Sequence, residues 1–198
     1  HILDAIESKR NPLNKRIKLV YIVILLSTIG FMGCGGSSNV PVSSFRHADG
    51  GTHASHISAD NTIAVVSTIV NSITLWDLST NKKQYVWRHQ DDGSNSVTNI
   101  HIAFDNSYVV TSDREAFALW NLDVGEPEGF WRIDETSIRD IAVSNQGRGI
   151  LVGRGSGKVM FFEPKTGRRL ECLGHKEKIN SLDISTKGFY ALTGGNDA

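Results

Sequence analysis

The chain has 198 residues, of which 39% are apolar and 21% are charged, and this is the composition of an ordinary globular protein. Lysine and arginine balance aspartate and glutamate, so the formal net charge is zero. Residues 1–33 hold five basic groups, which leaves 16 basic and 19 acidic groups for the rest of the chain. A protein that binds nucleic acid through phosphate contacts needs a basic face. The charge balance therefore argues against a nucleic-acid partner.

An export signal is predicted near the N-terminus. The basic cluster Lys15-Arg16-Ile17-Lys18 precedes an apolar run from Leu19 to Gly33, which is 15 residues long. A helix that spans a membrane needs about 20 residues, whereas a secretory signal peptide has this shorter pattern. Gly35-Gly36-Ser37-Ser38-Asn39 follows and is typical of a flexible tether. We expect residues 1–33 to be an N-terminal extension with the signal peptide, and residues 34–39 to be the tether.

This segment resembles a bacterial lipoprotein signal, because Gly33-Cys34 matches the last two positions of its lipobox. The resemblance implies that a lipid on Cys34 anchors the protein to a membrane. Gly35 in place of Asp after the cysteine implies sorting to the outer membrane, facing the periplasm. An uncleaved inner-membrane anchor and an ordinary secreted start are the alternatives.

Four columns of similar residues recur in the rest of the chain at steps of 42 or 44 positions. The columns are Phe45, Trp87, Trp131 and Leu173; His47, His89, Ile133 and His175; Trp76, Trp120 and Phe162; and Asn81, Gly125 and Gly167. Each period also contains short apolar runs bounded by Gly, Asn, Asp and Ser, which predict buried strands. Four short strands in about 40–45 residues are typical of one propeller blade.

These repeats resemble those of the WD40 family. Leu75-Trp76-Asp77-Leu78 has the Trp-Asp ending, and Gly174-His175 has the Gly-His opening. In the family, a His, an Asp, a Ser or Thr and a Trp form a buried hydrogen-bond network. The resemblance assigns His175, Thr193 and Asp197 to one such network. It assigns His89, Asp113 and Trp120 to another, although Asp113 lies one residue early.

We therefore predict an all-β chain that forms a partial WD40-type β-propeller over residues 40–198. Val40 to His47 provides one outer strand, and blades follow at about 53–89, 97–132 and 138–173. Two strands of a fourth blade begin at residue 179. About three and a half antiparallel four-stranded blades are thus expected, as part of a seven-bladed ring in a longer protein.

Other motifs suggest chemistry less strongly. Gly153-Arg154-Gly155-Ser156-Gly157-Lys158 lacks the P-loop spacing and is interpreted as a hairpin turn. His53 and His56 are expected on opposite faces of a strand, and His47 belongs to a repeat column, so no metal site is predicted. The acidic pairs Asp91-Asp92 and Asp134-Glu135 are interpreted as solvated loop residues. Cys172 is expected to be a small buried hydrophobic residue.

The resemblance implies a non-catalytic scaffold for protein–protein interaction in the bacterial cell envelope, with a membrane tether at Cys34. It needs no cofactor, and the partner protein is not specified. Two alternatives stay open. One is an envelope assembly factor, by analogy with the propeller lipoprotein of the outer-membrane β-barrel assembly machinery. The other is a propeller enzyme with its site in blades beyond residue 198.

Overall fold

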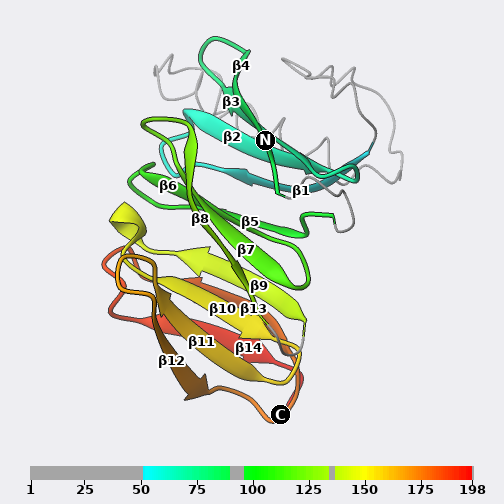
Figure 1. Cartoon of the computed structure of the whole chain (residues 1–198), viewed down its shortest axis with the longest axis vertical. Helices are drawn as coiled ribbons and strands as arrows, with labels where there is room; N and C mark the ends of the chain where they lie inside the picture. The colour runs from blue at the N-terminus through cyan, green and yellow to red at the C-terminus, as the bar shows by residue number, and fades with distance from the viewer. Residues whose placement is uncertain (1–50, 90–95, 134–136, 198) are drawn as a thin grey trace, which may run out of the picture. The chain divides into compact units, whose positions relative to one another are not determined.

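The computed structural model of the chain describes residues 51–89, 96–133 and 137–197 (Figure 1). Several predictions of the sequence analysis lie outside these ranges: the export signal, the tether, Cys34, the outer strand at Val40 to His47, and both acidic pairs. No helix within the described ranges has the length and apolar character to cross a membrane.

Fourteen strands and one short 3-10 turn, η1 (Asn145–Gly147), make up the described part of the chain (Figure 1). The all-β prediction is confirmed. The strands pair into three four-stranded antiparallel sheets and one two-stranded sheet, each with neighbouring strands in chain order. We call these sheets blades 1 to 4. Blade 1 contains β1 (Thr52–Ile57), β2 (Ile63–Thr68), β3 (Ser72–Asp77) and β4 (Lys82–Arg88); blade 2 contains β5 (Asn99–Ile102), β6 (Tyr108–Ser112), β7 (Ala116–Asn121) and β8 (Glu126–Arg132); blade 3 contains β9 (Ile138–Val143), β10 (Ile150–Arg154), β11 (Lys158–Glu163) and β12 (Arg168–Leu173); blade 4 contains β13 (Ile179–Ile184) and β14 (Ala191–Gly195).

Tight turns join the third and fourth strands of the three complete blades. Asn81, Gly125 and Gly167 occupy these turns with φ of 58°, 74° and 70°. Glycine and asparagine adopt this left-handed conformation at low cost, which explains their recurrence in one sequence column.

The apolar core lies between successive blades. One cluster joins blades 1 and 2 through Leu75 and Val109, and a second joins blades 2 and 3 through Leu119 and Ile150. A smaller third cluster joins blades 3 and 4 through Leu151 and Ile179. Blades 2 and 3 therefore pack against a neighbouring blade on both faces, and the repeat period follows from this shared packing.

Aromatic side chains connect the blades in a repeated way. Trp87 on β4 stacks on Trp120 of β7, with ring centroids 5.0 Å apart and 14° between the ring planes. Trp131 on β8 packs on Phe162 of β11 at 4.8 Å. Trp87 also donates a hydrogen bond from Nε1 to the carbonyl of Gly125, at 2.8 Å. The sequence column of Trp87 and Trp131 therefore packs against the column of Trp120 and Phe162 in the next blade.

The column that places Leu173 with Trp87 and Trp131 is wrong by one residue. Trp87 pairs with Ile73, Trp131 pairs with Phe117, and Cys172 is the residue that pairs with Val159 at the same place in blade 3. Blades 1 and 2 have an irregular register between their third and fourth strands, at Leu75/Trp76 and at Leu119/Trp120, whereas β11 and β12 pair without a shift. A bulge adds one residue to its strand. Because β11 and β12 pair without a bulge, the residue spacing of blades 1 and 2 points to Leu173, one residue past the equivalent position at Cys172.

Two further expectations have clear outcomes. Residues 153–158 connect the paired strands β10 and β11, with Gly157 at a φ of +83° in the turn, so the hairpin interpretation is confirmed. Cys172 is exposed, and the prediction that it is buried is wrong. It lies on β12, the last strand of its sheet, where a side chain has a neighbouring strand on one side only.

Candidate interaction site

Blade 4 brings together three residues of the predicted network. The Nδ1 atom of His175 lies 2.6 Å from Oδ1 of Asp197, and its Nε2 atom lies 3.1 Å from the hydroxyl of Thr193. Because a carboxylate only accepts, Nδ1–H donates to Asp197 and the Thr193 hydroxyl donates to Nε2. The backbone amide of Lys176 donates to Oδ2 of Asp197 at 2.9 Å, and this bond first, followed by the bond from His175, lowers the pKa of Asp197.

Blade 2 has a corresponding network that is fully buried. His89 Nδ1 lies 3.3 Å from Oδ2 of Asp113, and the indole N–H of Trp120 donates to the Thr111 hydroxyl at 2.9 Å. Burial alone would raise the pKa of Asp113, but hydrogen bonds from His89 and from the amides of Glu115 and Ala116 outweigh it and lower this pKa. Thr111 was not predicted.

Thr111 has a recognisable counterpart in blade 4. Tyr108 and Tyr190 accept equivalent backbone hydrogen bonds at the start of the second strands. Thr111 and Thr193 each lie three residues further on. Asp113 lies two residues after its threonine, whereas Asp197 lies four residues after, yet both carboxylates face their histidine. The shorter segment between Thr111 and Asp113 therefore still brings the carboxylate to the histidine of its own network.

The other WD40-type positions, Trp76, Asp77 and Gly174, pack against or cap neighbouring parts of the blades. Trp76 is buried under the ammonium group of Lys83, which lies 5.3 Å from its ring centroid. Asp77 caps the turn after β3, accepting bonds from the Ser79 hydroxyl at 2.6 Å and from the Ser79 amide at 2.7 Å. The bonds from Ser79 and Thr80 lower the pKa of Asp77 to about 2. Gly174 passes close to the backbone of Gly157, where an added Cβ would lie 2.8 Å from the Gly157 oxygen.

Side chains of the first strands bond across to the next blade. His53 Nδ1 on β1 lies 3.1 Å from the carbonyl oxygen of Val97, just before β5. The amide of Val143 on β9 donates to Nδ1 of His101 on β5 at 3.3 Å, and the amide of Leu182 on β13 donates to Oδ2 of Asp140 on β9 at 2.8 Å. These bonds connect all four blades at their first strands.

The turns after the first strands are also joined. Asn106 Nδ2 donates to Oδ2 of Asp60 at 2.8 Å, the Gln146 amide donates to Oδ2 of Asp105 at 3.0 Å, and the Asn145 amide donates to the Thr186 carbonyl at 3.0 Å. Phe104 lies within this row of turns and is 62% exposed. The row is therefore a continuous, hydrogen-bonded surface with an aromatic side chain open to solvent.

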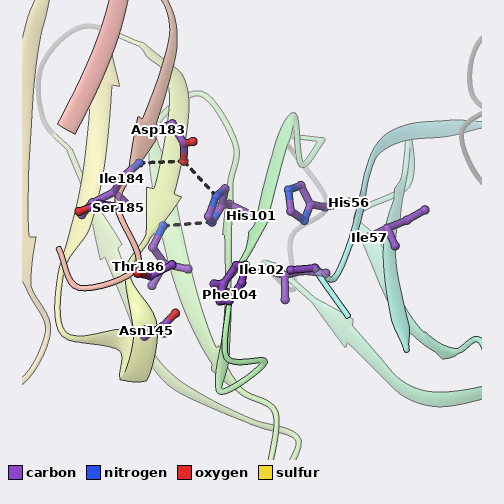
Figure 2. A pocket seen from close by; sticks show the side chains of 12 residues that line it. His56, Ile57, His101, Ile102, Phe104, Asn145, Asp183, Ile184, Ser185 and Thr186 are labelled. Atoms are coloured by element: carbon purple, nitrogen blue, oxygen red, sulfur yellow. Dashed lines mark hydrogen bonds and ion pairs between the residues drawn. The ribbon is translucent and has the colours of Figure 1, made fainter. Parts of the chain in front are cut away.

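A hollow of about 360 Å³ lies where the first strands run into these turns (Figure 2). It is lined by the imidazoles of His56 and His101, by Asp183 and by apolar side chains that include Phe104. The two imidazole rings are 5.0 Å apart, and Nε2 of His101 lies 3.6 Å from Oδ1 of Asp183. The close-up view shows His101 between His56 and Asp183.

Burial, followed by the charge of His56, lowers the pKa of His101 to about 4. Burial also lowers the pKa of His56. Within the described ranges, no three His, Cys, Asp or Glu side chains are grouped in a way that could hold a metal ion.

Comparisons with known proteins agree with this architecture. No family model matches the chain, and no curated protein matches it. Two similar solved structures are that of U3-55K and the crystal structure of the RRP9 WD40 repeats. Each is 15% identical to this chain with a TM-score of 0.65, and each match covers 76% of this chain. The fold is a WD40-type β-propeller. The chain spans about half the length of these structures, namely 47% and 46%.

Proposed function

We propose that this propeller chain is a non-catalytic, protein-binding scaffold held at the outer membrane through a lipid on Cys34. One observation carries the binding role: the turns after the first strands are tied to one another across the blades and present Phe104 to solvent. A rigid surface loses little conformational entropy on binding, and exposed aromatic side chains are enriched in protein interfaces.

The polar side chains of the blades support a structural role over a catalytic one. His89 and His175 each face an aspartate and are held between strands. Asp140 accepts two backbone hydrogen bonds, from Ile141 at 2.9 Å and from Leu182 at 2.8 Å. Groups used in this way hold the register of neighbouring strands. The alternative roles, as an assembly factor or as an enzyme, stay predictions.

The membrane tether rests on the sequence. The apolar run before Cys34, the Gly33-Cys34 pair and the Gly-Ser segment after it support a lipid anchor and a short spacer. In this arrangement the propeller would stand at the periplasmic face of the outer membrane, and the anchor would raise the local concentration of the scaffold for a membrane-associated partner.

Photo-crosslinking followed by capture from membranes of the native host tests both parts. Cys34→Ser should move the protein out of the membrane fraction and leave partner capture intact after solubilisation. Phe104→Asp should abolish capture. Val70→Asp is the matched control, because Val70 is 49% exposed in the β2–β3 turn, at the other end of the strands. Capture that survives Phe104→Asp and fails with Val70→Asp would contradict the proposed surface.

A further inference from the structure

The hollow at the ends of the first strands has a defined charge. Asp183 is the acidic residue among its described lining, and its side chain is 72% exposed. Both imidazoles have a pKa below the ordinary value because they are buried, so they are neutral at pH 7. The lining therefore has a net charge of about −1 and favours a cationic group over an anion.

The hydrogen-bonding groups of the hollow point to a donor as its ligand. His101 Nδ1 accepts from the Val143 amide, so its remaining proton is on Nε2, facing Asp183. His56 Nδ1 is buried and has no hydrogen-bond partner within the described part of the chain. A buried polar atom without a partner is unfavourable. Rotation of this imidazole towards the hollow would let an incoming N–H group supply the missing bond.

The rest of the wall is apolar. Ile57, Ile102, Val143 and Ile184 line the hollow, and so does the exposed ring of Phe104. Figure 2 shows Ile57, Ile102, Ile184 and Phe104 among the residues around it. This combination suits a short alkyl chain that ends in a positively charged nitrogen. The alkyl part contacts the isoleucines, and an aromatic face attracts the cation.

We propose that this hollow binds a primary alkylammonium group, with the Asp183 carboxylate as its counter-ion and His56 Nδ1 as a hydrogen-bond acceptor. Two sources share this chemistry: a lysine side chain of a partner protein, and a free aliphatic polyamine. The lysine form rests on the proposed scaffold function, and the polyamine form does not.

Titration of the full-length chain, followed through the imidazole nitrogen resonances of His56 and His101, tests the proposal. The probes are N-acetyl-lysine amide and putrescine, and N-acetyl-norleucine amide is the control with the same alkyl chain and no charge. We expect saturable shifts with N-acetyl-lysine amide or with putrescine, with a Kd in the roughly millimolar range as for other small fragments. The norleucine control should bind at least tenfold more weakly.

Variants make the test specific. Asp183→Asn keeps an oxygen that can accept from the Ile184 amide, at 2.8 Å in the native chain, so the strand should fold. It should weaken amine binding at least tenfold, whereas Asp123→Asn on the exposed β7–β8 turn should leave it unchanged. Phe104→Ala, which removes only a surface ring, should weaken binding several-fold and serves if Asp183→Asn does not fold.

Each outcome decides a point. Shifts with either amine support the ammonium site. Shifts with N-acetyl-lysine amide alone point to a lysine side chain as the ligand, and shifts with putrescine alone point to a polyamine. Equal shifts with norleucine, binding that survives Asp183→Asn, or no shift with either amine would overturn it. Loss of partner capture with intact amine binding would contradict only the scaffold function, and the reverse result only this inference.

Discussion

Trp87 of blade 1 lies face to face with Trp120 of blade 2, and the hydrogen bond from Trp87 to Gly125 holds it in place. The same junction contains the His89–Asp113 contact and the Trp120–Thr111 hydrogen bond. Stacking and polar contacts therefore join the two blades at one place, and this junction is where substitutions should affect stability most.

Trp87→Phe should keep much of the packing and remove the hydrogen bond to Gly125, which lowers the free energy of unfolding by about 1 kcal/mol. Trp87→Ala should cost about 3–5 kcal/mol because it leaves a cavity. Urea denaturation followed by circular dichroism measures both. Trp131→Phe is the comparison, since its described contacts are aromatic packing. An equal loss for Trp131→Phe and Trp87→Phe would contradict a role for the hydrogen bond.

Thr111→Val removes the hydroxyl that accepts from the Trp120 indole inside a buried network and keeps the side-chain shape. The unpaired N–H should cost about 1–3 kcal/mol. Thr193→Val removes the equivalent hydroxyl in blade 4, where water can reach His175, and should cost less than about 1 kcal/mol. Melting temperatures of the two variants give the order, and a larger effect for Thr193→Val would refute it.

Asp60 should titrate at about pH 2. Burial tends to raise its pKa, but hydrogen bonds from Asn106, Ser58 and Thr62 outweigh burial and lower the pKa to about 2. Because its folded-state pKa lies below the unfolded value, these bonds stabilise the fold above about pH 4, and the stabilisation is lost as the pH falls through about 2. Asn106→Ala should raise the Asp60 pKa towards 3.8 in a carboxyl NMR titration. Asp77, which has different partners, should stay at about 2 in the same spectrum.

His101 should make the fold sensitive to mild acid. Its folded-state pKa of about 4 lies below the ordinary value of 6.5, so between these values the unfolded chain binds a proton that the folded chain does not. Stability should therefore decrease on acidification from about pH 6.5 to 4, by up to about 1.4 kcal/mol per pH unit. His101→Asn keeps an acceptor for the Val143 amide and removes the titration. Parallel stability–pH curves for the two proteins would disprove this contribution.

Two glycines with positive φ should differ in their tolerance of alanine. At Gly157 an added Cβ would lie 2.2 Å from the His175 carbonyl oxygen, whereas at Gly167 no atom lies within 4 Å. Gly167→Ala should therefore cost only the backbone strain, about 1–2 kcal/mol. Gly157→Ala should cost more and should displace His175 from Asp197. Denaturation midpoints measure the costs, and equal midpoints would be inconsistent with the clash.

The repeat could be predicted from the sequence because equivalent residues bury the same surface in each blade. Trp76, Trp120 and Phe162 recur in phase and are all buried at equivalent places on β3, β7 and β11. Errors arose where local backbone geometry changes the count. The bulges of blades 1 and 2, which blade 3 lacks, moved the equivalent residue from Leu173 to Cys172.

The hollow gave no comparable signal. His56, His101 and Asp183 lie at the same place on three first strands, one residue before the strand ends, but they are of different types. A sequence column of similar residues indicates that they pack in the same way in each blade. His56, His101 and Asp183 form no such column, because each of them has a different partner. Thr111 was missed for a related reason. The sequence spacing of a threonine in a buried strand is the same whether its side chain packs or forms a hydrogen bond.

The amino-acid sequence by itself determined the four-stranded units, their turns and the aromatic contacts between them. Each of these depends on interactions that repeat with the period of the chain, so a single sequence displays them. The tertiary structure alone decided that His101 meets His56, Val143 and Asp183, which come from three other blades. That meeting depends on how each blade is rotated against the next, and the rotation is set by the packing of whole sheets.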